Sequence, residues 1–269
     1  MNGSWGALLR SEWRKVVTTK MVWVLTIVAV VFTCFNVVTL ALVGSGTIAT
    51  GAGGIGSTNQ LLDPNYITTL LALAGTASTF VLILGIIAMT GEYRHMTITS
   101  TFLATPRRGR VLVGKMGLYA VLGALIALIT VAAVLVATLV VLSRFDHAPV
   151  SASTVASVVL GAVIGCVLYA VLGVSLGALI KSQITAIILA MVWVFLVEAL
   201  LSLLLPSVSK WLPGGALNAA MDVTVRTDMT GGLTQADHLP PWGGAAVLLA
   251  YAAVFAVLAS RTTLRRDIT

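Results

Sequence analysis

GEYRHMTITSTFLATPRRGRVLVGK, residues 91–115, is the longest charged interruption between two strongly apolar segments of this 269-residue chain. Six charged residues lie in it, and five of the six are basic. An excess of Lys and Arg is typical of loops that stay on the cytoplasmic side of a membrane. The stretch therefore indicates a cytoplasmic loop of a membrane protein, to which a soluble partner could bind.

Local signals predict a short helix within this loop. Thr90 can cap a helix, and Glu92 would then lie in its first turn, where the helix dipole favours an acid. Pro106 would block continuation of the helix. Apolar side chains lie on two sides of the predicted helix, which suits a helix wedged between two bodies. The alternative is an interfacial loop whose arginines, at residues 107–110, bind phospholipid headgroups.

The composition excludes an ordinary soluble protein. Hydrophobic residues make up 58% of the chain, charged residues 9%, and the mean hydropathy is +1.04. A bilayer core of about 30 Å needs a helix of roughly 20 apolar residues, and six runs are long enough. They are Met21–Val43, Tyr66–Thr90, Met116–Leu142, Ser153–Ile180, Ile184–Leu205 and Trp242–Ser260. We expect one all-α polytopic domain with six transmembrane helices, because the runs are too uniformly apolar for barrel strands.

The positive charges predict the orientation. Of the 16 Lys and Arg residues, 13 lie in the two terminal segments, the central loop and the short loop at Lys181, and three lie in the other loops. This bias places both termini in the cytoplasm and the chain in the plasma membrane. The net charge of +7 is then a topology and lipid signal. Nucleic acid is not an expected partner, because the basic residues are spread along the membrane borders.

An amphipathic interfacial helix is predicted at residues 4–19. Trp5 and Trp13 lie on its apolar side, at the depth of the lipid headgroups. Arg10 and Arg14 lie on the other side, towards membrane lipid phosphates or a partner. The alternative is a basic flank that only orients the first span.

Small residues in the fourth span predict close helix packing. Gly161 and Gly165 are four residues apart, as are Gly173 and Gly177. Glycines at this spacing allow two helix backbones to approach closely. The pattern predicts a tight helix contact and says little about function.

Glu198 is the only acid well inside a predicted span. An intramembrane acid suggests a proton or a cationic substrate. The alternative is a structural role, in which the carboxyl is protonated or paired with Arg144 or Lys210. The sequence leaves both hypotheses open.

Motifs for catalysis or metal binding are absent from the sequence. Residues 109–115 fit the G-x-x-x-x-G-K pattern of a phosphate-binding loop, but Met116 stands where Ser or Thr must bind magnesium. The three histidines are far apart, so a metal site is unsupported. We expect no catalytic residue, no metal and no cofactor in this chain.

The opening residues 8–23, LLRSEWRKVVTTKMVW, and the central stretch 91–115 together resemble those of type-two ABC transporter permeases. The resemblance covers nearly the whole chain and includes a re-entrant loop before the last span, which residues 206–225 resemble. In that family the central segment forms a coupling helix that docks on an ATPase subunit. This implies coupling roles for Glu92, Tyr93, Arg94, His95 and Thr97. Where the family usually has Gly before Thr, this chain has Met96.

The resemblance implies the transmembrane subunit of an exporter. ATP and Mg²⁺ would be bound by a separate ATPase subunit, and the permease would pair with a second copy or a homologous permease. A hydrophobic or amphipathic drug, lipid or peptide is the implied substrate. Two other functions stay open at this point, namely a proton- or ion-coupled transporter that uses Glu198 and a membrane scaffold that transports nothing.

Overall fold

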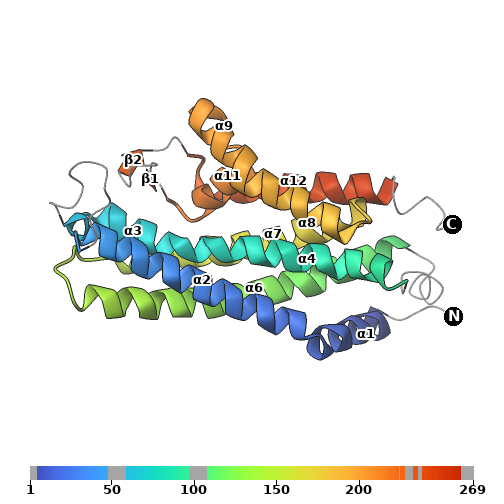
Figure 1. Ribbon diagram of the computed structural model, residues 1–269. Coiled ribbons are helices and arrows are strands. Elements are labelled where there is room, and N and C mark those ends of the chain that lie inside the picture. The colour runs from blue at the N-terminus through green and yellow to red at the C-terminus, as the bar shows by residue number, and fades with distance from the viewer. Residues whose placement is uncertain are drawn as a thin grey trace.

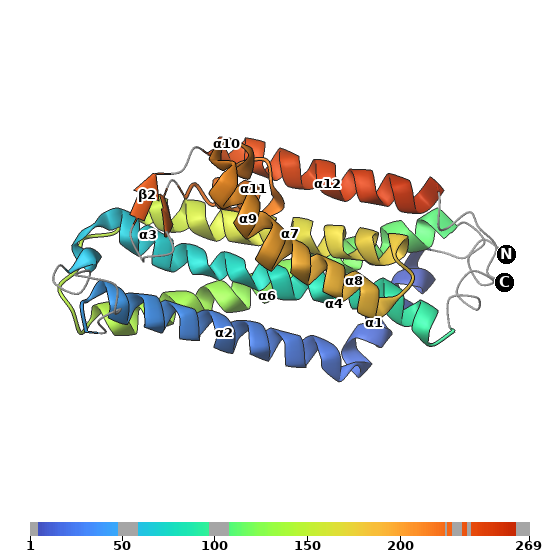
Figure 2. The same cartoon turned by 45° about the horizontal axis from the view of Figure 1, so that its top comes forward.

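The protein is a bundle of long helices that run roughly side by side (Figures 1 and 2). The computed structural model describes residues 5–47, 59–96, 108–223, 225–227, 233–235 and 238–261. Within these ranges, six helical segments are long and apolar enough to cross a membrane. They are α2 (Lys20–Gly44), α3 to α4 (Pro64–Arg94), α6 (Arg108–Leu142), α7 (Ala152–Leu179), α8 to α9 (Gln183–Leu204) and α12 (Pro241–Arg261). The predicted helical class with six spans is confirmed.

Two of these spans are interrupted by a different helix type. The second span consists of α3 (Pro64–Ala72), the 3-10 turn η3 (Leu73–Thr76) and α4 (Ala77–Arg94). The fifth consists of α8 (Gln183–Val192), the π-helical turn η4 (Trp193–Val197) and α9 (Glu198–Leu204). Such irregular turns within a helix frequently mark functional sites.

The shorter elements lie outside the spans. α1 (Trp5–Thr18) precedes α2, and the 3-10 turn η2 (Gln60–Leu62) precedes α3. Between the fifth and sixth spans lie two helices and one antiparallel pair of strands, which are α10 (Pro206–Ser209), α11 (Pro213–Ala220), β1 (Val225–Thr227) and β2 (Leu233–Gln235).

Polar side chains begin several of the helices. The Asp63 side chain accepts a hydrogen bond from the backbone N–H of Asn65, and Pro64 occupies the first turn of α3. Ser151 caps α7 and Ser182 caps α8 in the same way. These caps satisfy backbone N–H groups that have no partner inside the helix. They mark where α3, α7 and α8 begin.

The sequence predicted that a coupling helix begins near Glu92, and this predicted start is wrong. α4 continues to Arg94, so Glu92 lies in its last turn. Thr90 is no cap, because its hydroxyl donates to the carbonyl oxygen of Ile86 within the same helix. The helix ends after Arg94, with His95 as its cap. Met96 follows with a φ of 56°, the left-handed conformation that commonly ends helices. Thr97 and Pro106 lie outside the described residues.

The third span begins earlier than the apolar run suggested. α6 starts at Arg108, eight residues before Met116, and carries Arg110 and Lys115 within its first turns. A polar flank can stay helical when its charges find partners, and Lys115 finds them in α1 and α4. The connection between the second and third spans is correspondingly shorter than expected.

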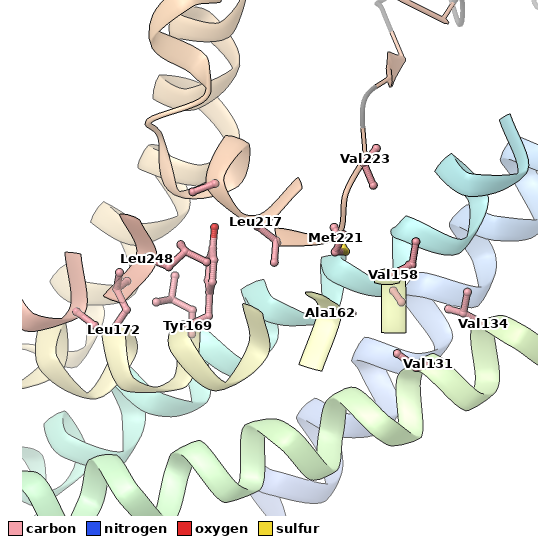
Figure 3. Packing of buried hydrophobic residues seen from close by; sticks show 14 of the residues in the cluster. Val131, Val134, Val158, Ala162, Tyr169, Leu172, Leu217, Met221, Val223 and Leu248 are labelled. Carbon is pink, nitrogen blue, oxygen red and sulfur yellow. The ribbon is translucent and has the colours of Figure 1, made fainter. Parts of the chain in front are cut away.

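α7 lies at the centre of the bundle and packs on α4, α6 and α12. Figure 3 shows the core cluster that joins α7 to α6, α11 and α12, with Tyr169 and Leu172 near Leu217 and Leu248. A Cβ on Gly173 or Gly177 would meet the backbone carbonyls of α4. One on Gly161 would meet the backbone at the end of α11, and one on Gly165 would meet the side chain of Leu217 in α11. The four glycines therefore serve two close contacts, where the sequence suggested one.

The fifth span leans away from the other helices at α9 (Figure 1), and its most apolar window is the least buried of the six. α11 is largely buried and packs against α7 and α12. The loop that the sequence marked as re-entrant, residues 206–225, therefore begins with the mostly exposed α10 and continues into a buried helix, α11.

Candidate functional site

Four charged side chains from three helices meet at one end of the bundle. Glu12 and Lys15 come from α1, Glu92 from the last turn of α4, and Lys115 from the first turns of α6. Lys115 Nζ lies 2.5 Å from Glu12 Oε2 and 2.9 Å from Glu92 Oε1. Lys15 Nζ lies 2.6 Å from Glu12 Oε1 and 2.6 Å from Glu92 Oε1. We call these four residues the ionic cluster.

The ionic cluster is balanced in charge and mostly buried. The side chains of Glu12 and Lys115 are each 2% exposed and that of Glu92 is 6% exposed, whereas Lys15 is 45% exposed. Buried ions are strongly destabilising unless they are paired and hydrogen-bonded. Each of the four residues is paired, but Glu92 meets that condition through Oε1 only, because its Oε2 is buried without a hydrogen-bond partner. The four residues therefore depend on one another.

Electrostatics within the cluster favour the charged forms of the two α1 residues. Burial alone would raise the pKa of Glu12, but Lys115 and then Lys15 hold it below its usual value of 4.5. Burial alone would lower the pKa of Lys15, but hydrogen bonds to Glu12 and Glu92 raise it. The lowered pKa of Glu12 stabilises the folded protein at pH values above 4.5, and that contribution is lost as the pH falls through the lowered value.

The residues assigned to ATPase coupling are not brought together on one exposed surface. Glu92 is buried in the ionic cluster, and Tyr93 is half-buried against the cluster formed by Met89, Leu112 and Val174. Arg94 and His95 are exposed at the end of α4.

α1 has an inner face that the sequence did not reveal. Val16 packs against Leu118 and Leu122 of α6, on the same side of α1 as Glu12. Arg10, Trp13 and Arg14 are exposed on the remainder of the helix, and the side chain of Trp5 lies outside the described residues. Lys15, the basic residue next to Arg14, binds Glu12 and Glu92.

Glu198 lies at the wall of a large cavity. It is 9% exposed. Its Oε1 accepts from Trp193 Nε1 at 3.1 Å, and its Oε2 accepts from the backbone N–H of Gly214 at 3.0 Å. Trp193 is five residues before Glu198, and the intervening π turn brings two positions of that spacing to one side of the span. Gly214 belongs to the first turn of α11, where a carboxylate is favoured.

The cavity beside Glu198 has a volume of about 610 Å³ and lies between α2, the second span, the fifth span and α11. We call it the Glu198 cavity. A smaller cavity of about 250 Å³ shares Tyr169, Val194 and Glu198 with it and is otherwise lined by apolar side chains and Pro213. We call this one the apolar cavity. Volumes in this range suit small-molecule ligands.

No group of three or more His, Cys, Asp or Glu side chains that could hold a metal ion occurs in the part of the chain that the structure describes.

Comparison with protein families decides what kind of protein carries these sites. Residues 8–197 match the model of the family described as "ABC-2 family transporter protein". The chain belongs to the ABC-2 transporter family. The match covers most of the chain and includes all four residues of the ionic cluster. A comparison with curated proteins found no match.

Membership in the ABC-2 family establishes a multi-pass membrane protein and the transmembrane permease component of an ABC transporter. Permeases of this family generally work with an ABC ATPase subunit and often as dimers. The resemblance noted from the two basic stretches is confirmed. The matched range ends at Val197, so Glu198, α11 and α12 lie beyond it.

Proposed function

We propose that this chain is the membrane subunit of an ATP-driven exporter in the plasma membrane. A separate ATPase subunit binds ATP and Mg²⁺, and a second copy or a homologous permease completes the translocation path. The substrate is a hydrophobic or amphipathic molecule such as a drug, a lipid or a peptide. ABC-2 family membership supports the ATPase partnership, and the cavities beside Glu198 support binding of a small molecule.

The observation that carries this proposal is the ionic cluster. Glu92 lies just before the connection from α4 to α6, and Lys115 lies shortly after it. Their ion pair joins the two spans on either side of that connection. Glu12 and Lys15 join α1 to the same pair. An ATPase subunit that pushes on residues 95–107 would therefore move α1, α4 and α6 together.

This mechanism requires the ionic cluster to lie on the cytoplasmic side. The distribution of Lys and Arg supports that orientation, with both termini in the cytoplasm. α1 and the C-terminal end of α12 lie at the same end of the bundle (Figure 1), as an even number of spans requires.

A cysteine at Asp146 should react with an impermeant thiol reagent in intact cells, and a cysteine at Lys181 should not. Both positions are exposed, and they lie in turns at opposite ends of α7. The starting protein should have Cys34 and Cys166 replaced by Ser, so that each variant carries one thiol. Permeabilised cells provide the control for Lys181, which should then react. Labelling of Lys181→Cys without permeabilisation would show that the orientation is the opposite one. The proposed docking site would then not lie in the cytoplasm.

Arg94 and His95 together replaced by Ala should weaken binding of the ATPase subunit. They are the exposed members of the coupling set at the end of α4, so they can contact a partner without disturbing the spans. One exposed charge contributes only about 0–1 kcal/mol, but anchors in a packed interface contribute about 2 kcal/mol or more. The measurements are the amount of ATPase that co-purifies with the permease and the rate of ATP-driven transport.

Arg10 and Arg14 together replaced by Ala provide a matched control, because both side chains are exposed cations on α1. They lie outside the residues proposed to couple to the ATPase, so co-purification of the ATPase should stay unchanged. Equal loss of the ATPase in both double variants would indicate a general charge effect. An unchanged Arg94/His95 variant would contradict docking at the end of α4.

A further inference from the structure

Two hydroxyls in the lining of the Glu198 cavity have donated their hydrogens to backbone carbonyls. The Thr69 hydroxyl donates to the backbone carbonyl of Asn65 at 2.9 Å, and the Thr76 hydroxyl donates to that of Leu73 at 2.8 Å. A hydroxyl that has donated its hydrogen presents only lone pairs to a ligand. Other polar side chains in the lining, such as Asn218, can donate, so the Glu198 carboxylate is the group that favours a positively charged ligand.

The charge of the lining points the same way. The residues that the structure describes around this cavity include one acid, Glu198, and no Lys, Arg or His. An anionic ligand in this cavity would be repelled by the carboxylate. A cationic ligand would be attracted to it.

Aromatic rings surround the same space. Phe32 of α2 and Phe80 of α4 pack edge to face with ring centroids 5.6 Å apart, and both line the cavity. Tyr169 and Phe195 line it as well. Aromatic faces attract organic cations, especially where water is excluded. A metal ion fits poorly, since it needs several oxygen or nitrogen ligands and the cavity offers one carboxylate.

The adjoining apolar cavity provides room for a hydrophobic body. Leu172, Leu176, Trp193 and Phe255 contribute to its lining, and Glu198 lies on the boundary between the two cavities. A molecule with its charge near Glu198 could place an apolar group in either space. We propose that this site binds lipophilic organic cations and that Glu198 is the residue that selects for their positive charge. This inference rests on the proposed exporter function, because it names the substrate class of that exporter.

The test is direct binding of tetraphenylphosphonium to the purified permease in phosphatidylcholine nanodiscs. Tetraphenylborate has the same shape and the opposite charge, so it separates charge selection from hydrophobic binding. The unmodified protein should bind the cation more tightly than the anion. Glu198→Gln should weaken binding of the cation by about tenfold or more without weakening binding of the anion. Gln keeps the size of the side chain and an oxygen that can accept from Gly214.

Two further variants test whether the effect on binding comes from the charge inside the cavity. Asp222→Asn removes one negative charge from an exposed residue outside the cavity lining, and it should leave binding of both ions unchanged. Ser202→Lys keeps Glu198 and introduces a cation into the lining, so it should also weaken binding of tetraphenylphosphonium. This second variant tests the proposal even where Glu198→Gln fails to fold.

The outcomes distinguish the substrate class from the exporter function. Equal affinity of Glu198→Gln and the unmodified protein for the cation, or no preference for the cation over the anion, would overturn the inference. In that case a permease that still co-purifies with its ATPase and drives ATP-dependent transport would keep the proposed function. Cation-selective binding by a permease that engages no ATPase would overturn the exporter and leave the charge selection standing.

Discussion

Replacing Lys115 with Met should destabilise the folded protein by about 3–5 kcal/mol, the cost typical of breaking a buried ion pair by removing one partner. Lys115 is 2% exposed and binds both Glu12 and Glu92. Without it, two buried carboxylates share the half-exposed Lys15. The thermal unfolding midpoint of the purified protein should fall by on the order of 10 °C. ATP-driven transport should fall further than the amount of folded protein, because α1 loses its link to α6.

Two companion variants separate the ionic cluster from a general effect of losing a lysine. Lys20→Met removes an exposed lysine at the start of α2 and should change the midpoint little. Glu12→Gln combined with Lys115→Met leaves one acid and one lysine, Glu92 and Lys15, and should be more stable than Lys115→Met alone. A Lys115→Met variant as stable as the unmodified protein would show that Glu12 and Glu92 do not depend on Lys115 and that the cluster does not hold α1.

Replacing Gly173 with Ala should prevent close packing of α7 on α4 and cost about 3 kcal/mol, at the upper end of typical overpacking. A Cβ at this position would overlap the backbone carbonyl of Leu82 and approach the Cα of Gly85 at 3.2 Å. Backbone atoms cannot rotate away as a side chain can, so the two helices would have to separate. We expect a strong loss of monodisperse protein after extraction from the membrane, measured by size-exclusion chromatography.

Gly117 provides the matched control for this substitution. It lies within α6, and a Cβ there would have no neighbour within 4 Å. Gly117→Ala should therefore be neutral or stabilise the protein by about 0.5–1 kcal/mol, because Ala favours the helix. Similar losses in both variants would mean that glycine flexibility matters here, and the close α4–α7 contact would not explain the result.

The spans were predictable from the sequence because each of them must meet a simple physical requirement. A run such as Ser153–Ile180 must be apolar and about as long as the bilayer core is thick, and α7 follows it closely. The start of α6 was not predictable in this way. Hydropathy places the border at Met116, but ion pairs with distant residues let the helix extend back to Arg108.

The ionic cluster was missed for the same reason. Glu12 and Lys115 are 103 residues apart, and Lys15 and Glu92 are 77 apart, so only tertiary packing brings them together. A signal was present in retrospect, since Glu12 and Glu92 are acids on a side where nearly all other charges are basic.

The π turn at residues 193–197 left no trace in the sequence, although it fixes where the Glu198 side chain points. Hydropathy and composition are the same whether or not a helical turn contains one extra residue. The sequence thus placed Glu198 in a span but could not decide between its two roles.

The burial of the Lys115–Glu12 pair affects how firmly α1 is held against the transmembrane helices. Dissolved salt screens exposed charges over about 8 Å at physiological ionic strength, but it screens buried pairs much less. Lys15, which is 45% exposed, should feel concentrated salt, whereas Lys115 and Glu12 are sealed from it. α1 should therefore stay packed against α6 even in concentrated salt. The amino-terminal helix is then an integral part of the permease, despite lying outside its spans.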